Sequence, residues 1–599
     1  MSRFNRVSCD KSITTNHEGA KAWSLDAEMA LYTRVATCIR QDQFYTPNSN
    51  DELNRIKSLI SQVDPEFVAQ LAIYAREQMH LRTIPLVLTV ELAKIKDRKP
   101  DLLRKLTKRI IQRADEITEI LGYYVAANGK RERDFAIHNG VKKPLPANTK
   151  KRLFKLSKGL IKGLRDAFHK FDEYQFSKYS AENKDISMKD ALFVVCPKAS
   201  TTKEDELFKK IANGALKPAN TWEVASSGMG QAVAAEAKER GLNEVETEAL
   251  KNAKAKEMWE KRLEIKGSGQ MGYMALLKNL MNFLKYDISI DHIKIVASRL
   301  SDEKEVAISK QLPFRFVTAY RMIREHAGVI TSLGMCTSYG YNGRSNFSNE
   351  KIYVYDKDIS NLIKRKGMLP VISNPKASIL LEALEMAVKH ACKNIPAFDW
   401  DTNVLIASDV SGSMRKPIST KKDGKGNTIV ESKLLCYDIG LSLSMMLQHK
   451  SKVVSSGIFG NSFMVLPMPK DNILANVDML HGLDGLVGYS TNGYLVIDYA
   501  IEAANKGIIY DKVFMFSDAQ IYNDTDQRHI NSEWLKFKKI NPKAKLYIFD
   551  LAGYGTTPVN LRQNDVYMIA GWSENVFDML KAIEDGSGAI EKIKKISIE

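Results

Sequence analysis

The sequence of 599 residues lacks any apolar run long enough to cross a membrane, and its first twenty residues lack the apolar segment of a secretory signal. Its six cysteines stand far apart, with no CxxC pair, which argues against a zinc ribbon or a disulfide framework and favours reduced thiols. We therefore expect a cytoplasmic chain without a membrane partner. One hydrophobic core cannot serve a chain of this length, so about two to four domains are expected.

Positive charge is what the chain has in excess, and the excess is confined to one region. Residues 401–599 contain 22 Lys and Arg against 23 Asp and Glu, whereas the first 400 residues contain 66 against 48. The whole net charge of +17 therefore arises before residue 401. A folded region with such a surplus attracts polyanions, most often nucleic acid. A lysine-rich surface that serves only solubility is the alternative.

Residues 22–400 have apolar side chains at three- and four-residue spacing, which predicts helix after helix. Clear cases are SLDAEMALYTRVATCIRQ, DPEFVAQLAIYAREQMHL and TIPLVLTVELAKIKD. We find no alternating strand pattern in this stretch. Successive helix pairs with short connections predict an α-solenoid of the HEAT type, although no clean fixed-period repeat is present. The strongly charged residues 236–266 predict exposed helix.

The pattern changes at residue 401. Short apolar runs such as NVLIASDV and KVFMFSD alternate with helical segments such as SKLLCYDIGLSLSMMLQH. This alternation predicts a parallel, doubly wound α/β sheet. We accordingly expect a helical domain over residues 1–398 and an α/β domain over residues 399–599. Ligands of such sheets bind at the carboxyl ends of the strands.

Polar residues stand at the ends of these predicted strands. Asp409, Ser411 and Ser413 follow NVLIAS at alternate positions, so their side chains can converge, while Thr491 precedes a helix and Asp518 ends KVFMFSD. Hard oxygen ligands with few carboxylates suit Mg²⁺, or Mn²⁺ or Ca²⁺, rather than zinc. The set resembles the metal-ion-dependent adhesion site of von Willebrand factor A domains, DxSxS…T…D. Two carboxylates and three hydroxyls would leave the positive charge of the ion partly uncompensated, so the ion would attract an acidic side chain of a partner. The alternative to a metal site is that Ser411 and Ser413 cap a turn and Asp518 caps a helix.

A basic helix is the most informative segment of the first 400 residues. In TKKRLFKLSKGLIKGLRDAFHKFDEYQFSKY, four lysines recur at steps of four, three and four and form one stripe: Lys151, Lys155, Lys158 and Lys162. Further on, Lys170, Tyr174 and Lys178 share a helix face. Lysines interleaved with a tyrosine suit a phosphate backbone with an occasional stacked base. For any single stripe, a solvated face of an amphipathic helix is the competing interpretation.

Five segments carry a resemblance to a known family. They are LAIYAREQMHLRTIP, EITEILGYYVAANG, AFHKFDEYQFSKY, MGYMALLKNLMNF and QLPFRFVTAYR. They look like segments of the TROVE module, the RNA-binding module shared by telomerase-associated, Ro and vault proteins, and they occur in the family's order. Because a von Willebrand A-like domain follows, the chain resembles the Ro autoantigen family and its bacterial and phage counterparts over about residues 15–590.

The resemblance implies a function in RNA quality control without enzymatic activity. It implies that the helices close into a ring, that the single-stranded 3′ end of a misfolded non-coding RNA passes through the hole, and that a small Y-like RNA binds the basic outer surface. A 3′ exonuclease is among the expected protein partners of a monomeric chain. The further candidate RNA contacts are Lys198, Arg315, Arg321 and Arg324. Relatives carry His-Pro-Lys-Pro where this chain has Cys196-Pro197-Lys198-Ala199, which leaves the mode of Y RNA binding open.

Two functions of other classes compete with this hypothesis. The chain could be a protein–protein scaffold that uses the helical ring and the metal site for acidic partners, without RNA; the basic surplus favours RNA. A ribonuclease has less support, because no His pair or carboxylate cluster stands out in the helical region, where His80, His138 and His169 are isolated.

Overall fold

A computed structural model gives the fold of the chain. It describes residues 13–16, 19–38, 50–127, 135–138, 141–144, 156–179, 186–267, 269–327, 374–393, 395–418, 420–422, 428–430, 434–521, 529–561 and 565–599. Two compact units are interleaved in the sequence: one takes residues 1–37 and 225–589, the other residues 38–224 and 590–599. The predicted boundary at residues 398 and 399 falls where the first strand of the large sheet begins, and as a division between domains it stays a prediction.

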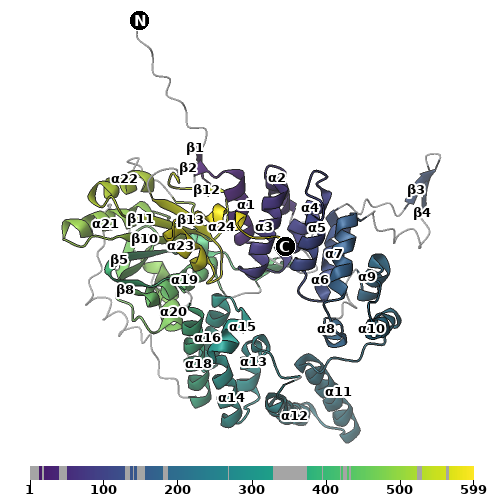
Figure 1. Ribbon diagram of the computed structural model, residues 1–599. Coiled ribbons are helices and arrows are strands. Elements are labelled where there is room, and N and C mark those ends of the chain that lie inside the picture. Colours follow the sequence, from purple (N-terminus) through teal and green to yellow (C-terminus); the bar gives the residue numbers. More distant parts are fainter. Residues whose placement is uncertain are drawn as a thin grey trace. The chain divides into compact units, whose positions relative to one another are not determined.

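The unit of residues 38–224 and 590–599 consists mainly of packed helices, coloured purple to blue in Figure 1. They are α2 (Asn50–Ile60), α3 (Pro65–Glu77), α4 (Thr83–Lys94), α5 (Leu102–Ile110), α6 (Asp115–Ala127), α7 (Lys158–Phe168), α8 (Glu173–Lys178), α9 (Met188–Val195) and α10 (Thr202–Asn213). Helix α3 packs on α4 and α5 packs on α7, as the predicted helix pairs require. At Gly163 a Cβ atom would lie 2.5 Å from Thr107 Cβ, so glycine allows α5 and α7 to approach closely.

This unit has two features that differ from the sequence-based expectation. An antiparallel hairpin of β3 (Phe135–His138) and β4 (Val141–Pro144) interrupts the helices, so the stretch is mostly rather than wholly helical. The end of the chain also belongs here: Gln70 Nε2 donates a hydrogen bond to Lys594 O at 2.7 Å. This hydrogen bond joins residues more than five hundred positions apart in the sequence, and local periodicity cannot reveal such a contact.

The other unit contains the remaining helices of the first 400 residues and the α/β sheet. The helices are α1 (Ala27–Ala36), α11 (Trp222–Arg240, which begins in the other unit), α12 (Glu244–Glu264), α13 (Tyr273–Lys285), α14 (Ile290–Leu300), α15 (Glu303–Ser309), α16 (Pro313–His326) and α18 (Pro375–Ala391). Helix α18 packs against α14, α15 and α16. The charged segment of residues 236–266 covers the end of α11 and all of α12. Helix α12 is mostly exposed but buries Ala255, Trp259, Arg262 and Leu263, so the expectation of exposed helix holds for one face of it. Among the described residues, no helix is both long and apolar enough to span a membrane.

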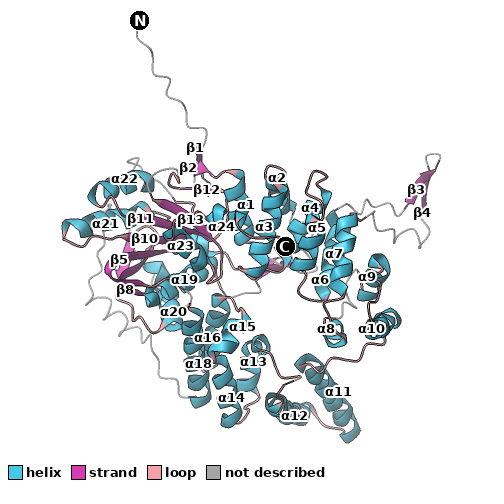
Figure 2. Cartoon of the chain, viewed as in Figure 1, coloured by secondary structure: helices cyan, strands magenta, loops and turns pink. Residues whose placement is uncertain are grey.

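The large sheet has six strands in the order β13-β11-β10-β5-β8-β9, drawn in magenta in Figure 2. They are β5 (Phe398–Asp409), β8 (Ser451–Phe459), β9 (Phe463–Leu466), β10 (Lys512–Ser517), β11 (Lys545–Asp550) and β13 (Val566–Ala570). All neighbours pair in parallel except β9, which is antiparallel to β8. The helices between the strands are α19 (Cys436–Lys450), α20 (Ile473–Leu483), α21 (Tyr494–Asn505) and α22 (Ile530–Ile540). Helix α23 (Val576–Glu584) follows β13, and α24 (Ala589–Lys594) lies mainly in the other unit. A hairpin of β6 (Thr420–Lys422) and β7 (Thr428–Val430) lies between β5 and α19.

Helices cover both faces of this sheet. On one face, Leu405 and Met515 belong to a buried cluster with Trp534 of α22. On the other face, a Cβ atom at Gly440 of α19 would lie 3.3 Å from Phe516 Cβ. Side chains of a strand alternate between faces, so strands covered on both sides must be apolar throughout. The predicted doubly wound α/β region is confirmed.

The first described residues pack on the α/β sheet and do not begin the helical series. Strands β1 (Ile13–Thr15) and β2 (Lys21–Ser24) form a small antiparallel sheet with β12 (Thr556–Thr557). The Asn16 side chain donates to Ile521 O at 2.8 Å, and Tyr32 OH of α1 donates to Ala570 O at 3.2 Å. Local periodicity did not indicate these contacts with the carboxyl-end loops of the sheet, and the assignment of the segment to the helical domain stays a prediction.

Candidate metal centre and nucleic-acid interface

The first predicted metal loop lies directly beyond β5. Strand β5 ends at Asp409, whose carboxylate accepts hydrogen bonds from Ser411 N (2.9 Å) and Ser517 Oγ (2.6 Å). The hydroxyls of Ser411 and Ser413 lie 3.3 Å apart. Asp409 and Ser411 are buried, whereas Ser413 is partly exposed. The three side chains therefore gather at one place, as their alternate spacing predicted.

Backbone hydrogen bonds hold the loop of Thr491 beside the first loop. Gly412 N donates to Tyr489 O at 2.8 Å, and Asn492 N donates to Gly460 O, beyond β8, at 3.0 Å. Thr491 lies between these two anchors and is buried. The turn also requires glycine, because Gly488 has a φ of +73° and a Cβ atom there would collide with the side chain of Asn461.

The second carboxylate of the predicted set follows β10, the strand next to β5. Asp518 is buried, and its charge raises the pKa of Asp409 beyond the effect of burial. Asp550, at the end of β11, is a third buried carboxylate: burial raises its pKa to about 7, although the N–H groups of Gly553 and Ala552 donate to it. The sequence analysis missed Asp550, although its place at the end of the predicted strand KLYIFD was a usable signal.

These residues fit a divalent cation. Two buried carboxylates repel each other, and a cation between Asp409 and Asp518 would offset that repulsion. Hydroxyls of Ser411, Ser413 and Thr491 add neutral oxygen donors of the kind that Mg²⁺ accepts. The described residues contain no cluster of three or more His, Cys, Asp or Glu side chains suited to a metal, so this set would rely on hydroxyl oxygens.

Part of the lysine stripe is visible on α7. Lys158 and Lys162 are exposed, while Leu160 and Leu164 on the same helix are buried. The predicted division into a basic and an apolar face is therefore present in this helix. Lys151 and Lys155 lie outside the described residues. Two neighbouring ammonium groups on an open helix face can contact consecutive phosphates.

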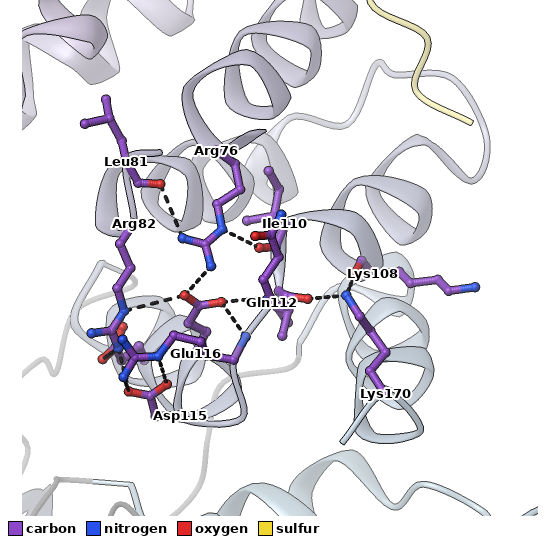
Figure 3. A network of polar contacts seen from close by, with 12 residues as sticks. Arg76, Leu81, Arg82, Lys108, Ile110, Gln112, Asp115, Glu116 and Lys170 are labelled. Carbon is purple, nitrogen blue, oxygen red and sulfur yellow. Dashed lines mark hydrogen bonds and ion pairs between the residues drawn. The ribbon is translucent and has the colours of Figure 1, made fainter. Parts of the chain in front are cut away.

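Lys170 takes a different role from the predicted one, as Figure 3 shows. Its ammonium donates to Lys108 O at 2.9 Å and also to Ile111 O. These carbonyls lie at the end of α5, where the last carbonyls of a helix lack intrahelical donors. Beside them, Arg76 and Glu116 form a buried ion pair of 2.5 Å. Lys170 therefore closes a helix end, although the residue as a whole is exposed; its assignment as an RNA contact stays a prediction.

Tyr174 and Lys178 remain exposed on α8, as predicted. Lys178 Nζ lies 5.7 Å from the ring centroid of Tyr174 and 5.4 Å from that of Tyr179. The guanidinium of Arg113 lies 4.1 Å from the ring centroid of Tyr179. The structure thus extends the pair into an alternating row of cations and rings, to which it adds Arg113 and Tyr179. Sequence spacing does not reveal Arg113 as a member of this row, because Arg113 comes from another helix pair.

Lys198 is exposed beyond α9. Cys196 is exposed at the end of α9, has a φ of +47° and donates from Sγ to Phe193 O at 2.8 Å. A thiol held in this way offers neither the charge nor the second nitrogen of an imidazole.

Arg315 is a half-buried cation on α16. Burial lowers the pKa of its guanidinium, and its Nη1 lies 3.9 Å from Met274 Sδ. In the part of the chain that the structure describes, no carboxylate pairs with it. A half-buried guanidinium without an anion is unfavourable, so this residue suits a phosphate ligand.

Arg321 and Arg324, further along α16, are buried and already paired. Arg321 donates to Asp438 of α19 at 2.9 Å and to Asp478 of α20 at 3.0 Å, and Arg324 pairs with the same Asp478. His481 Nδ1 lies 2.7 Å from Asp438. Burial alone would raise the pKa of Asp438, but the charges of Arg321 and His481 hold it well below its ordinary value. The two arginines anchor α16 to the α/β helices, so their prediction as RNA contacts is corrected.

Comparisons with known proteins identify the class to which this arrangement belongs. A family model described as the TROVE domain matches residues 26–256 and 242–399. Telomerase protein component 1 of Mus musculus is 23% identical over 362 residues, which are 50% of this chain and 13% of that protein. The protein of the same name from Rattus norvegicus is 22% identical over 360 residues, 49% of this chain and again 13% of that protein. The chain therefore spans only a small part of these curated relatives.

Among solved structures, the Ro (RSR) protein of Deinococcus radiodurans matches 93% of this chain and 99% of its own, with 15% identity and a TM-score of 0.49. The fold combines a mostly helical region with an α/β sheet region, and exposed cationic residues lie on the helices. Since the TROVE model matches more than half of the sequence, the chain belongs to the TROVE domain family, whose members are generally RNA-binding proteins. This confirms the resemblance of the five segments.

Proposed function

We propose that this protein binds misfolded non-coding RNA as a non-catalytic component of RNA quality control. One observation carries the proposal: the region that matches an RNA-binding family is also the region that holds all of the net positive charge. In this proposal the helices close into a ring, and the hole accepts a single-stranded 3′ end. A duplex is excluded because an A-form helix is too wide and hides its base edges.

Two groups of residues support separate RNA contacts. Lys158 and Lys162 offer charge on an open helix face and suit the structured body of an RNA. Arg315, a half-buried cation without a carboxylate partner, suits a strand that enters the helical region. A small Y-like RNA would bind the basic outer surface near Tyr174 and Lys178, through stacking and charge and without the family's histidine contact.

The α/β domain in this proposal docks another protein. Asp409, Ser411, Ser413, Thr491 and Asp518 bind Mg²⁺, and the ion accepts a carboxylate from a partner such as a 3′ exonuclease. The support is a donor set of two buried carboxylates and three hydroxyls at adjacent strand ends. We further propose that the chain is a monomer and acts in the cytoplasm.

The experiment compares two RNA duplexes of equal stem sequence in competition for the full-length protein, one with a single-stranded 3′ tail and one with blunt ends. We expect the tailed duplex to bind roughly tenfold more tightly or better, because a stacked base contributes about 1–3 kcal/mol. Changing the tail sequence should have little effect, since phosphate contacts and stacking carry little base information. Equal affinity of the two duplexes would exclude threading and leave only a basic outer surface.

A further inference from the structure

Lys416 is an exposed cation at the edge of the sheet that holds the predicted metal ligands, and it is not one of those ligands. The first metal loop continues from Ser413 to Lys416, which is exposed. Lys416 Nζ donates to the Tyr554 hydroxyl at 3.0 Å and lies 5.7 Å from the centroid of that ring. This hydrogen bond and the charge of Asp518 raise the pKa of Lys416, so the ammonium stands within electrostatic reach of a predicted ligand. No carboxylate of the described residues pairs with it.

Apolar surface lies beside the loop of Thr491. Leu486 is 48% exposed and Tyr489 is 55% exposed, so both offer apolar surface to a ligand. The Arg415 guanidinium lies 4.6 Å from the Tyr489 ring centroid and pairs with Asp484 at 2.9 Å. The charge of Arg415 is therefore already balanced, and its main effect is to hold the tyrosine ring in place.

We propose that this edge docks an acidic polypeptide segment through three contacts made together. One carboxylate of the segment completes the coordination of the ion, a second pairs with Lys416, and an apolar side chain between them covers Leu486 and Tyr489. The inference rests on the proposed metal site and deepens it, because it names the residues that choose the partner. We call Lys416, Leu486, Tyr489 and Tyr554 the selector residues.

Charge at this edge favours a polypeptide over RNA. Binding of nucleic acid depends on several cations that neutralise successive phosphates, whereas Lys416 is the one described cation of the loop without a carboxylate. Three carboxylates, Asp409, Asp518 and Asp550, are buried near the ends of β5, β10 and β11, and the charge of Asp518 acts on Lys416. Residues 401–599 as a whole carry a net charge of −1. A partner with two separated carboxylates matches one divalent ion and one ammonium better than a chain of phosphates does.

Two of the selector residues, Tyr489 and Tyr554, are of a type that is enriched in interface cores. Aromatic side chains and arginine are enriched where binding energy concentrates, and they are effective when neighbouring groups exclude water from them. Tyr489 is positioned by its own backbone, whose carbonyl accepts from Gly412 in the metal loop at 2.8 Å. The backbone of Tyr489 is therefore fixed to the metal loop, and Arg415 lies against its ring, so a bound segment would lose little free energy in ordering it.

The test uses the full-length protein and a fluorescein-labelled peptide, Gly-Glu-Leu-Asp-Tyr-Glu-Gly, with binding followed by fluorescence anisotropy in Mg²⁺ and in EDTA. Variants Lys416→Gln and Tyr489→Ser are compared with Lys452→Gln, a matched control at the start of β8, where the lysine is also exposed. Binding of Mn²⁺ is measured separately by titration calorimetry. Unlabelled oligouridylate serves as a competitor.

We expect peptide binding in Mg²⁺ that EDTA abolishes, a loss of about fivefold in affinity for Lys416→Gln and a similar loss for Tyr489→Ser, as truncation of one contact commonly costs about 1 kcal/mol. The Lys452→Gln variant should bind like the unchanged protein. If both selector variants bound the peptide with unchanged affinity, the inference would be overturned but the proposed metal site would stand. Displacement by oligouridylate at equal concentration would assign the edge to RNA instead. A protein that binds no Mn²⁺ would refute the proposed metal site itself.

Discussion

Replacing Arg321 by alanine should destabilise the joint between α16 and the α/β helices. The guanidinium is 7% exposed and bridges Asp438 and Asp478, which are 0% and 4% exposed. Removal of one partner from a buried ion pair costs about 3–5 kcal/mol, because the remaining charge stays buried without compensation. Arg324 still pairs with Asp478, and His481 still contacts Asp438. The expected cost is therefore at the lower end, about 3 kcal/mol.

A chain of this size does not unfold in one step, so a single free energy of unfolding is not defined for it. Hydrogen exchange resolved by segment measures the local free energy of opening instead. A cost of about 3 kcal/mol corresponds to amides in α16 and α20 that exchange roughly a hundredfold faster. Changing Asp438 to asparagine in the same variant should recover part of the protection, since it removes a buried charge left without its partner.

The matched control is Arg315→Ala on the same helix. Arg315 has no carboxylate partner among the described residues, so its loss leaves no buried anion, and exchange in α16 should change by less than about fivefold, or 1 kcal/mol. RNA affinity should show the opposite order, with Arg315→Ala weaker than Arg321→Ala. Exchange in the Arg321→Ala variant that stays within threefold of the unchanged protein would refute the argument from the buried network.

Three further outcomes follow from other parts of the structure. Asp409→Ala should lose Mg²⁺ binding in calorimetry while RNA affinity changes by less than tenfold, about 1.4 kcal/mol; a larger drop would contradict the separation of the two sites. Changing Lys158 and Lys162 to alanine should reduce the slope of log affinity against log salt by about 0.7–0.9 per lysine. An unchanged slope would show that the two lysines only form the solvated face of an amphipathic helix. Burial raises the pKa of Glu574 to about 7, so the stability that its protonated form contributes is present at low pH and is lost as the pH rises through that value. Glu574→Gln should therefore slow hydrogen exchange in the adjoining α23, relative to the unchanged protein, by more at pH 8 than at pH 5, and an equal difference at both would show that this carboxyl does not titrate as proposed.

The sequence predicted best what local periodicity determines. Strands buried on both faces, such as KVFMFSD, are apolar at every position, and the rule that ligands gather at their carboxyl ends located Asp409 and Asp518. Residue spacing on α7 likewise placed Lys158 and Lys162 on an open face opposite the buried Leu160. In these cases the side chain's environment depends on residues a few positions away, or on the general geometry of a sheet.

Prediction failed where an environment depends on a distant partner. Arg321 and Lys178 look alike in sequence, each a cation near an aromatic residue on a helix, yet one is buried against aspartates more than a hundred positions away and the other is exposed. Lys170 satisfies carbonyls of a helix about sixty residues earlier. The segment around Asn16 bonds to a loop some five hundred residues later. No spacing rule within a helix distinguishes a cation that meets solvent from one that meets a buried anion.

The position of Arg315 depends on both parts of the chain. Arg315 and Arg321 are six residues apart on α16, which places them on different faces of the helix at 3.6 residues per turn. One face holds the half-buried cation that suits a phosphate, and the other is fixed to α19 and α20 by buried charge pairs. Hydrophobic residues would often stabilise such a joint equally well, but ion pairs are directional and allow one register. Helices α19 and α20 therefore determine where α16 presents Arg315. Arg315 lies within the region that the TROVE model matches, and α19 and α20 lie outside it. The geometry of this candidate RNA contact thus depends on residues beyond the matched region.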